Sequence, residues 1–209
     1  MEIVKRAFDA AFETREEDSS GIITGRPVVL NSRTDLGFCD EVIDSGALQK
    51  TDLRDVRLCL NHDTSYVYAR SRQNNGSSTM QIMTDAIGLT FTAGLDIQNS
   101  PKAQDLYSAI KRGDIDKMSF MFTIDGYEWE NLKSDHPTRH ITSIGTIFEI
   151  SAVTFPAYDS TSISARDASA LESVKRELEK ARASLQEAPD GADVELAKAK
   201  YFFMRRKNK

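Results

Sequence analysis

The chain has 209 residues, of which 40% are hydrophobic and 28% are charged, with a formal net charge of −5. This length and composition fit a soluble globular protein with one substantial domain around a single core. The acidic balance argues against a general nucleic-acid binder, which is usually basic. No apolar run approaches the roughly 20 residues of a membrane-spanning helix, so we expect no membrane partner.

Two further features bear on the compartment. The N-terminal stretch MEIVKRAFDAAFETREEDSSG lacks the apolar core and the small-residue cleavage site of a secretory signal. Cys39 and Cys59 are too few for a disulfide framework, and we expect both to be reduced thiols. Together these features predict a cytosolic type of protein.

From about residue 21 to residue 166, short apolar runs alternate with Gly, Asp and Asn, which predicts mostly strands. The stretch MQIMTDAIGLTFTAGL predicts two strands, 80–84 and 88–93. The stretch DVRLCLNHD, residues 55–63, also has a strand period of two. One face of that predicted strand carries Val56, Leu58, Leu60 and His62.

The stretch NSPKAQDLYSAIKRGD, residues 99–114, predicts a helix. Asn99 or Ser100 is the expected N-cap, Pro101 stands in the first turn, and Gly113 ends the helix. Many short strands with one such helix predict an α+β fold: a small, mostly antiparallel β-barrel, closed or nearly closed, with flanking helices. The predicted buried stripe of the helix is Ala103, Leu106, Tyr107 and Ile110.

After Arg166 the composition becomes helical. We expect an N-terminal segment (1–20), a main domain (21–166) and a helical, partly mobile C-terminal tail (167–209), which the stretch EAPDGAD interrupts. Two alternatives stay open: the tail docks on a partner or stays mobile, or its helix packs back onto the domain. The apolar seam of this helix is Leu171, Val174, Leu178, Ala181 and Leu185.

Two residues on predicted strands are candidates for chemistry. His62 ends an apolar strand face, so its imidazole is either hydrogen-bonded structurally or positioned to move protons. Ser119 needs an adjacent base to act as a nucleophile. If its apolar neighbours form the core, its hydroxyl points away from them, toward a cleft or solvent. These neighbours are Met118, Phe120, Phe122 and Ile124.

A third candidate is Glu149, in the predicted strand TSIGTIFEISAVTF. An ionised carboxylate among apolar neighbours must be paired. Its partner is either an imidazole, which it would orient, or an arginine such as Arg139. The strand period places Ile147, Glu149, Ser151 and Val153 on one face, and Phe148, Ile150 and Ala152 on the other.

Other kinds of site are not expected. His136 and His140 in HPTRH suggest zinc, but Pro137 lies between them and no carboxylate stands at a helical offset. Cys59 is predicted on the strand face opposite His62, so we expect no cysteine nucleophile. The sequence has no G-x-S-x-G elbow, no phosphate loop and no dinucleotide fingerprint, so we expect neither a cofactor nor a metal.

Three segments taken together resemble the prohead (capsid maturation) serine proteases of tailed bacteriophages. They are LCLNHD (58–63), IKRGDIDKMSFMF (110–122) and IFEISAVTFPAYDSTSISAR (147–166). EVIDSGAL (41–48) is similar to the segment that precedes the histidine in that family. The resemblance covers roughly residues 22–166. Since the family is similar to the herpesvirus assemblins, the resemblance implies a small β-barrel wrapped by helices.

The resemblance also implies a catalytic triad. Ser119, in Met-Ser-Phe, would be the nucleophile, and His62, in Asn-His-Asp, would be the general base and then the acid. Glu149, in Phe-Glu-Ile-Ser, would orient His62. His140 is the alternative third member, because the herpesvirus enzymes use a second histidine. The chain departs from the family at Met121, where a glycine is usual, which leaves the cleft shape and the substrate preference open.

The implied function is a serine endopeptidase of viral capsid maturation. Inside the procapsid, in the host cytoplasm, it would cleave scaffold or the scaffold-like segment of the major capsid protein, and then itself. Self-cleavage is expected near 163–171 or 187–193. A weak homodimer is also expected, with Tyr107 and Ile110 as candidate contacts. The alternatives are a catalytically inactive capsid-assembly or scaffold protein that retains the fold, and an unrelated β-barrel binding module.

Overall fold

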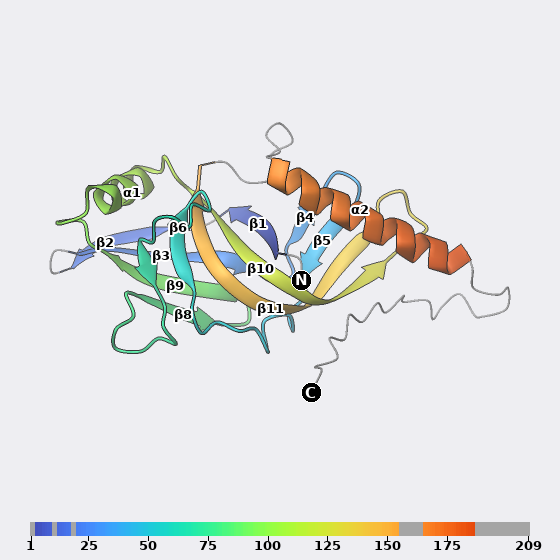
Figure 1. Ribbon diagram of the computed structural model, residues 1–209, viewed down its shortest axis with the longest axis horizontal. Helices are drawn as coiled ribbons and strands as arrows, with labels where there is room; N and C mark the ends of the chain where they lie inside the picture. The colour runs from blue at the N-terminus through green and yellow to red at the C-terminus, as the bar shows by residue number, and fades with distance from the viewer. Residues whose placement is uncertain (1–2, 10–11, 18–19, 155–164, 187–209) are drawn as a thin grey trace.

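The computed structural model describes residues 3–9, 12–17, 20–154 and 165–186 (Figure 1). Neither of its two helices combines the length and the apolar character needed to cross a membrane. The elements in chain order are β1 (Ile3–Asp9), β2 (Glu13–Glu17), β3 (Ser20–Val29), β4 (Arg33–Asp35), β5 (Asp40–Ile43), β6 (Arg57–Leu60), β7 (Ala69–Arg70), β8 (Met80–Thr84), β9 (Gly88–Leu95), α1 (Pro101–Arg112), β10 (Lys117–Glu130), β11 (Thr138–Val153) and α2 (Ala165–Gln186).

The strands form two sheets. The seven-stranded sheet has the order β1-β10-β11-β5-β4, with β6 also paired to β11 and β7 paired to β6. The four-stranded sheet has the order β2-β3-β9-β8. Most ladders are antiparallel, but β11 pairs in parallel with β5 near its start and with β6 near its end. The α+β class and the mostly antiparallel pairing agree with the sequence-based expectation.

Among the residues that it describes, the structure shows no closed barrel, and the prediction of a nearly closed one is not confirmed. Within the described part of the chain, no ladder joins the two sheets; one path ends at β1 and β4, the other at β2 and β8. Two packed sheets and one barrel both bury one face of every strand. Alternation along single strands therefore cannot distinguish the two architectures.

Both sheets contribute to one core. Phe91 from β9 lies in the same buried cluster as Phe120 and Ile150 from β10 and β11. On β3, a Cβ added at Gly25 would lie 2.9 Å from the Phe91 ring and 3.2 Å from Met118 Sδ. Glycine at this position therefore lets β3 pass close to β10.

Helix α1 begins and ends as predicted. Ser100 Oγ accepts a hydrogen bond from a backbone N–H of the first turn, Pro101 follows it, and Gly113 ends the helix with φ of 79°. The predicted stripe is buried. Tyr107 and Ile110 are each only 5% exposed and belong to the core, so the predicted dimer contact through them is wrong.

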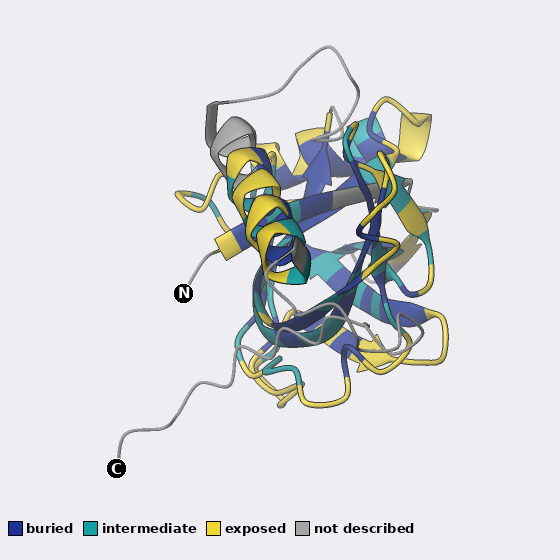
Figure 2. Ribbon diagram, turned by 90° about the vertical axis from the view of Figure 1, so that its right-hand side faces the viewer, coloured by how far each residue is buried: buried dark blue, intermediate teal, exposed yellow. Residues whose placement is uncertain are grey.

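Helix α2 is exposed on its outer side and buried where it faces the sheet (Figure 2). Glu177 binds Arg139 of β11 at 2.7 Å, and Arg182 donates to the carbonyl of Leu132 at 3.0 Å. The helix therefore packs back onto the domain, the second of the two alternatives, while residues 187–209 lie outside the described residues. Its buried seam is Leu171, Val174, Leu178 and Ala181, packed with Tyr127 and Trp129.

Candidate active site

The turn after β6 takes His62 out of the strand alternation. β6 ends at Leu60, and Asn61 and His62 both have positive φ, 51° and 60°. The Asn61 N–H donates to the carbonyl of Ala152 at 2.9 Å, and Asn61 Oδ1 accepts from the Thr154 N–H at 2.9 Å. Asparagine tolerates the left-handed region better than most residues. The prediction that His62 shares a face with the apolar residues of β6 is wrong, because the strand has already ended.

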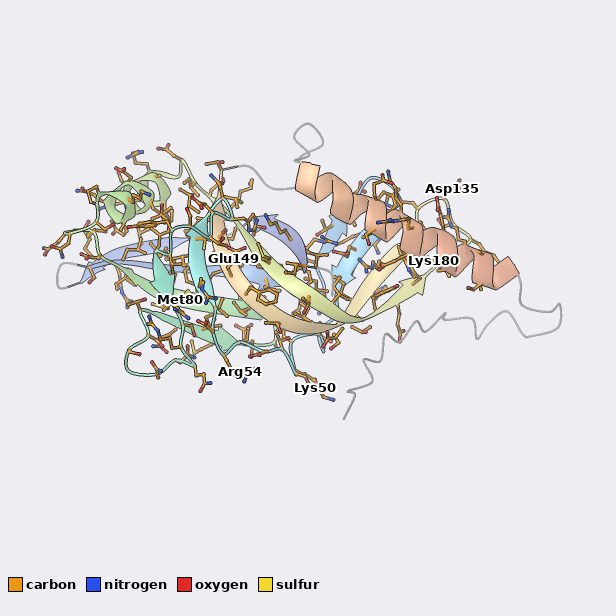
Figure 3. All side chains as sticks on the ribbon, viewed as in Figure 1. Lys50, Arg54, Met80, Asp135, Glu149 and Lys180 are labelled. Atoms are coloured by element: carbon orange, nitrogen blue, oxygen red, sulfur yellow. The ribbon has the colours of Figure 1, made fainter. Side chains whose placement is uncertain are left out.

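A β-bulge at Phe148 sets the direction of Glu149. Met121 pairs with Glu149, but Phe122 pairs with Ile147, which leaves Phe148 as an extra residue on β11. Ile147 belongs to the core, whereas Glu149 points to the other face, near the place where β11 runs beside β6 (Figure 3). The prediction that these two residues share a face is therefore wrong, because the bulge interrupts the alternation.

His62 and Glu149 are in direct contact. His62 Nδ1 lies 2.5 Å from Glu149 Oε1, and the side chains are 11% and 1% exposed. An ionised carboxylate only accepts hydrogen bonds, so with Glu149 ionised the proton of this contact is on Nδ1; in a neutral imidazole, Nε2 is then the proton acceptor. Arg139, the other candidate partner, instead binds Glu41 at 3.2 Å and Glu177 at 2.7 Å. Of the two alternatives for Glu149, the imidazole is its partner.

Ser151 contacts both of these residues and was given no role from the sequence. Its Oγ donates to Glu149 Oε2 at 2.5 Å and accepts from the His62 backbone N–H at 3.1 Å. Ser151 is 0% exposed. Residues two apart on a strand point to one face, and this spacing from Glu149 is the signal that could have indicated the contact.

Ser119 lies on β10, directly opposite Ser151 on β11. Opposite residues of an antiparallel pair point to the same face, with Cα atoms about 4.5–5.5 Å apart. Ser119 therefore shares the face of Ser151 and Glu149. The expectation that the other face of β10 belongs to the core is confirmed by its buried residues Met118, Phe120 and Phe122 and the partly buried Ile124.

The Ser119 hydroxyl is buried and has no hydrogen-bond partner among the residues that the structure describes. Ser119 is 0% exposed, and among the described residues nothing hydrogen-bonds to its Oγ. The expectation that this hydroxyl faces a cleft or solvent is wrong for this arrangement. Of the three predicted triad members, His62 and Glu149 are in hydrogen-bond contact, and Ser119 lies one strand away on the same face.

Cys59 shares this face too, because it pairs with Ser151 in the parallel ladder between β6 and β11. The prediction that its thiol points away from His62 is wrong, since the turn brings His62 to the same side. Burial, and then the negative charge of Glu149, raise the pKa of the Cys59 thiol to about 12. The thiol therefore stays protonated at neutral pH, which argues against a cysteine nucleophile.

The other two histidines have separate partners. His140, near the opposite end of β11 from Glu149, contacts Asp44 at 2.8 Å and Glu130 at 3.1 Å. Burial opposes its protonation, but the hydrogen bonds to the two carboxylates outweigh burial and raise the pKa of His140. His136 lies 3.2 Å from an oxygen of Asp40. His140, the alternative third member of the triad, is therefore hydrogen-bonded to other residues than His62.

A cavity of about 470 Å³ opens beside the turn that carries His62. Asn61 and Asp63, on either side of His62 in sequence, line it. The charged side chains of Asp63, Lys102 and Asp105 are exposed, so they lie at its rim. The remaining lining residues are mostly apolar: Leu60, Tyr66, Tyr68, Leu106, Ala109 and Ile115.

A family model described as caudovirus prohead serine protease matches residues 9–177 of the 209. The match contains the His62 turn, β10, β11 and the first part of α2. Comparison with curated proteins and comparison with solved structures each give no match. Since the matched range covers most of the sequence, the chain belongs to the caudovirus prohead serine protease family.

Proposed function

We propose that this chain is a serine endopeptidase in which Ser119 is the nucleophile, His62 the general base and Glu149 the residue that orients His62. The observation that carries the proposal is the 2.5 Å contact between His62 Nδ1 and Glu149 Oε1 on the sheet face that Ser119 shares. A carboxylate that holds one ring nitrogen leaves the other free to activate a serine. Family membership supports the same reaction class.

In the proposed mechanism, Ser119 Oγ forms a bond to the scissile carbonyl carbon while its proton moves to His62 Nε2. The tetrahedral oxyanion needs hydrogen-bond donors, which we expect to be backbone N–H groups. His62 then gives its proton to the leaving amine, the C–N bond breaks, and an acyl-enzyme remains. Water, activated by the same nitrogen, hydrolyses the ester and frees Ser119.

This route requires a rearrangement around Ser119. Because Ser119 is 0% exposed, a substrate carbonyl does not reach its Oγ in the arrangement described above. A buried polar group without a partner is unfavourable by about 1–3 kcal/mol, so an opening that hydrogen-bonds this hydroxyl to His62 regains part of that energy. Catalytic hydrogen bonds are often long in free enzymes and tighten when substrate binds.

The proposed substrates are the major capsid protein or scaffold inside the procapsid, in the host cytoplasm, and the chain itself. Family membership supports this assignment. For self-cleavage, part of 163–171 belongs to the packed helix α2, which argues against a cut within that part. The other proposed site, 187–193, lies outside the described residues.

The cavity beside His62 is the proposed site for an uncharged substrate side chain, because burying a charge against its apolar walls is costly. Replacing Ala109 with leucine should narrow it and raise KM for a cleaved peptide with little change in kcat. The matched control is Gln104→Leu, at an exposed position of α1. An unchanged KM in Ala109→Leu contradicts this use of the cavity.

The second candidate is a catalytically inactive capsid-assembly protein that retains the fold. The observation that favours it is the buried Ser119 Oγ, which has no hydrogen-bond partner in the described part of the chain. The two candidates differ in one measurable property, since only a protease reacts covalently at Ser119 with a fluorophosphonate.

The test of the proposed function is co-expression of the full chain with a candidate capsid precursor, followed by mass spectrometry of the fragments. The wild type should cleave the precursor and Ser119→Ala should not. Ser143→Ala, which removes a serine from β11 outside the site, is the matched control and should cleave normally. Normal cleavage by Ser119→Ala overturns the assignment.

A further inference from the structure

We infer that Ser151 is a positioning residue of this site, holding the carboxylate of Glu149 and the backbone of His62 through one hydroxyl. The inference rests on the proposed function and adds a member to the proposed triad. Ser151 acts through Glu149 and His62, because both of its hydrogen bonds go to those residues.

The carboxylate of Glu149 is held at both oxygens. Oε1 contacts His62 Nδ1 at 2.5 Å, and Oε2 accepts the Ser151 Oγ–H at 2.5 Å. A carboxylate that is only 1% exposed needs such partners to remain ionised. A contact at one oxygen alone leaves the carboxylate free to rotate about its Cγ–Cδ bond. The second contact fixes the plane of the group that holds the imidazole.

The same hydroxyl also fixes the backbone that carries the imidazole. A serine Oγ has one proton and two lone pairs. Its proton goes to Glu149, and a lone pair accepts the His62 N–H at 3.1 Å. His62 has φ of 60° and follows Asn61 at 51°, a left-handed conformation that is uncommon for residues other than glycine. Ser151 therefore links the backbone and the ring of His62.

The contacts also separate the roles of the two opposite serines. Ser151 donates its single hydroxyl proton to Glu149, so it is not placed to give that proton to His62 Nε2. Ser119, directly across the ladder, has an Oγ that is not engaged in a hydrogen bond within the described residues. A covalent label should therefore appear on Ser119 and not on Ser151.

The test is the second-order rate constant for labelling of the purified full chain by a small fluorophosphonate. The reagent forms an Oγ–P bond and releases fluoride, so the rate reports activation of Ser119 without a known substrate. The variants are Ser151→Ala, Ser151→Thr and the control Ser143→Ala.

Ser151→Ala should lower the rate constant by about 10–100-fold, less than the roughly 10⁴-fold loss when the carboxylate of a comparable triad is removed. Ser151→Thr keeps the hydroxyl and should restore most of the rate. Ser143→Ala should behave as wild type.

The outcomes separate this inference from the proposed function. Absence of label on wild-type Ser119 overturns both. Normal labelling of the wild type with unchanged rates in Ser151→Ala overturns the positioning role alone. An equal loss in Ser151→Ala and Ser151→Thr indicates packing only and overturns it as well. If Ser151→Ala does not fold by circular dichroism, Ser151→Cys, with a weaker donor of similar size, replaces it.

Discussion

Ser119 of β10 and Ser151 of β11 occupy opposite positions of one antiparallel ladder, yet of these two only Ser151 is hydrogen-bonded to the His62 and Glu149 pair. Both serines are 0% exposed. His62 and Glu149 are thus already in contact with each other, whereas Ser119, the proposed nucleophile, is hydrogen-bonded to neither of them. Opening around Ser119 therefore becomes a step that can be measured.

Labelling of Ser119 should be limited by that opening at high reagent concentration. At low concentration the rate should rise linearly with reagent, and at high concentration it should reach a plateau equal to the opening rate. The reason is that Ser119 Oγ is inaccessible in the closed arrangement. The measurement is the rate of mass addition to the intact protein as a function of reagent concentration.

The control for this prediction is a second fluorophosphonate with a different alkyl group. If opening limits the rate, both reagents reach the same plateau. Plateaus that differ between the reagents show that binding or chemistry is the slow step, and this outcome contradicts the prediction.

Replacing Glu149 with glutamine should lower the labelling rate constant by about 10⁴-fold, the loss seen when the carboxylate of a comparable triad becomes an amide. The amide keeps the size of the side chain but no longer selects the tautomer with the proton on His62 Nδ1. Glu179→Gln, at an exposed position of α2, is the control and should label normally. A Glu149→Gln rate within a few-fold of wild type would show that the contact is structural.

Replacing Glu41 with glutamine should lower the free energy of unfolding by about 3–5 kcal/mol, the usual loss when one partner of a buried ion pair is removed. Glu41 binds Arg6 of β1 and Arg139 of β11, and these side chains are 2%, 1% and 3% exposed. Its loss removes a carboxylate from both buried guanidinium groups, of which Arg139 keeps its contact with Glu177. Urea unfolding measures the change, with Glu128→Gln on β10 as the control.

The same carboxylate should make stability depend on pH in a defined direction. Burial by itself raises the pKa of Glu41, but Arg6 and Arg139 outweigh burial and lower this pKa below its ordinary value of 4.5. The stabilisation is therefore fully present above pH 4.5 and is lost as the pH falls through the lower pKa of the folded state. On acidification, the wild type should lose more unfolding free energy than Glu41→Gln. A parallel loss in both proteins contradicts this assignment.

Docking of α2 can be followed by the single tryptophan of the chain. Trp129 is 2% exposed and packs in one cluster with Leu178 of α2. Leu178→Ala should lower the free energy of unfolding by about 2–5 kcal/mol. The shift of the tryptophan emission to longer wavelength should therefore occur at a lower urea concentration than in the wild type. Lys180→Ala, at an exposed position of the same helix, should leave the free energy of unfolding and the urea dependence of the emission unchanged. Identical unfolding curves for Leu178→Ala and wild type would contradict this role of Leu178.

Several features followed from local chemistry alone. The start and end of α1 depend on Ser100, Pro101 and Gly113, which act on backbone groups within one turn. The predicted strands at 80–84 and 88–93 follow from alternation and the turn between them, and the structure extends the second strand to Leu95. The buried stripe of α1 and the apolar seam of α2 follow from helical spacing, which fixes a shared face but not the surface that covers it.

The site itself depends on contacts between segments far apart in the chain. Residue types indicated His62, Ser119 and Glu149 as candidates, but alternation placed His62 on the wrong face and put Ile147 beside Glu149. A left-handed turn tied to the end of β11 and a bulge set by pairing with β10 decide these directions. The packing of α2, the two open sheets and the burial of Ser119 likewise follow from long-range pairing. Side-chain period is a property of a few neighbouring residues, whereas bulges, turns of this kind and strand partners are selected by the energy of the whole assembled core.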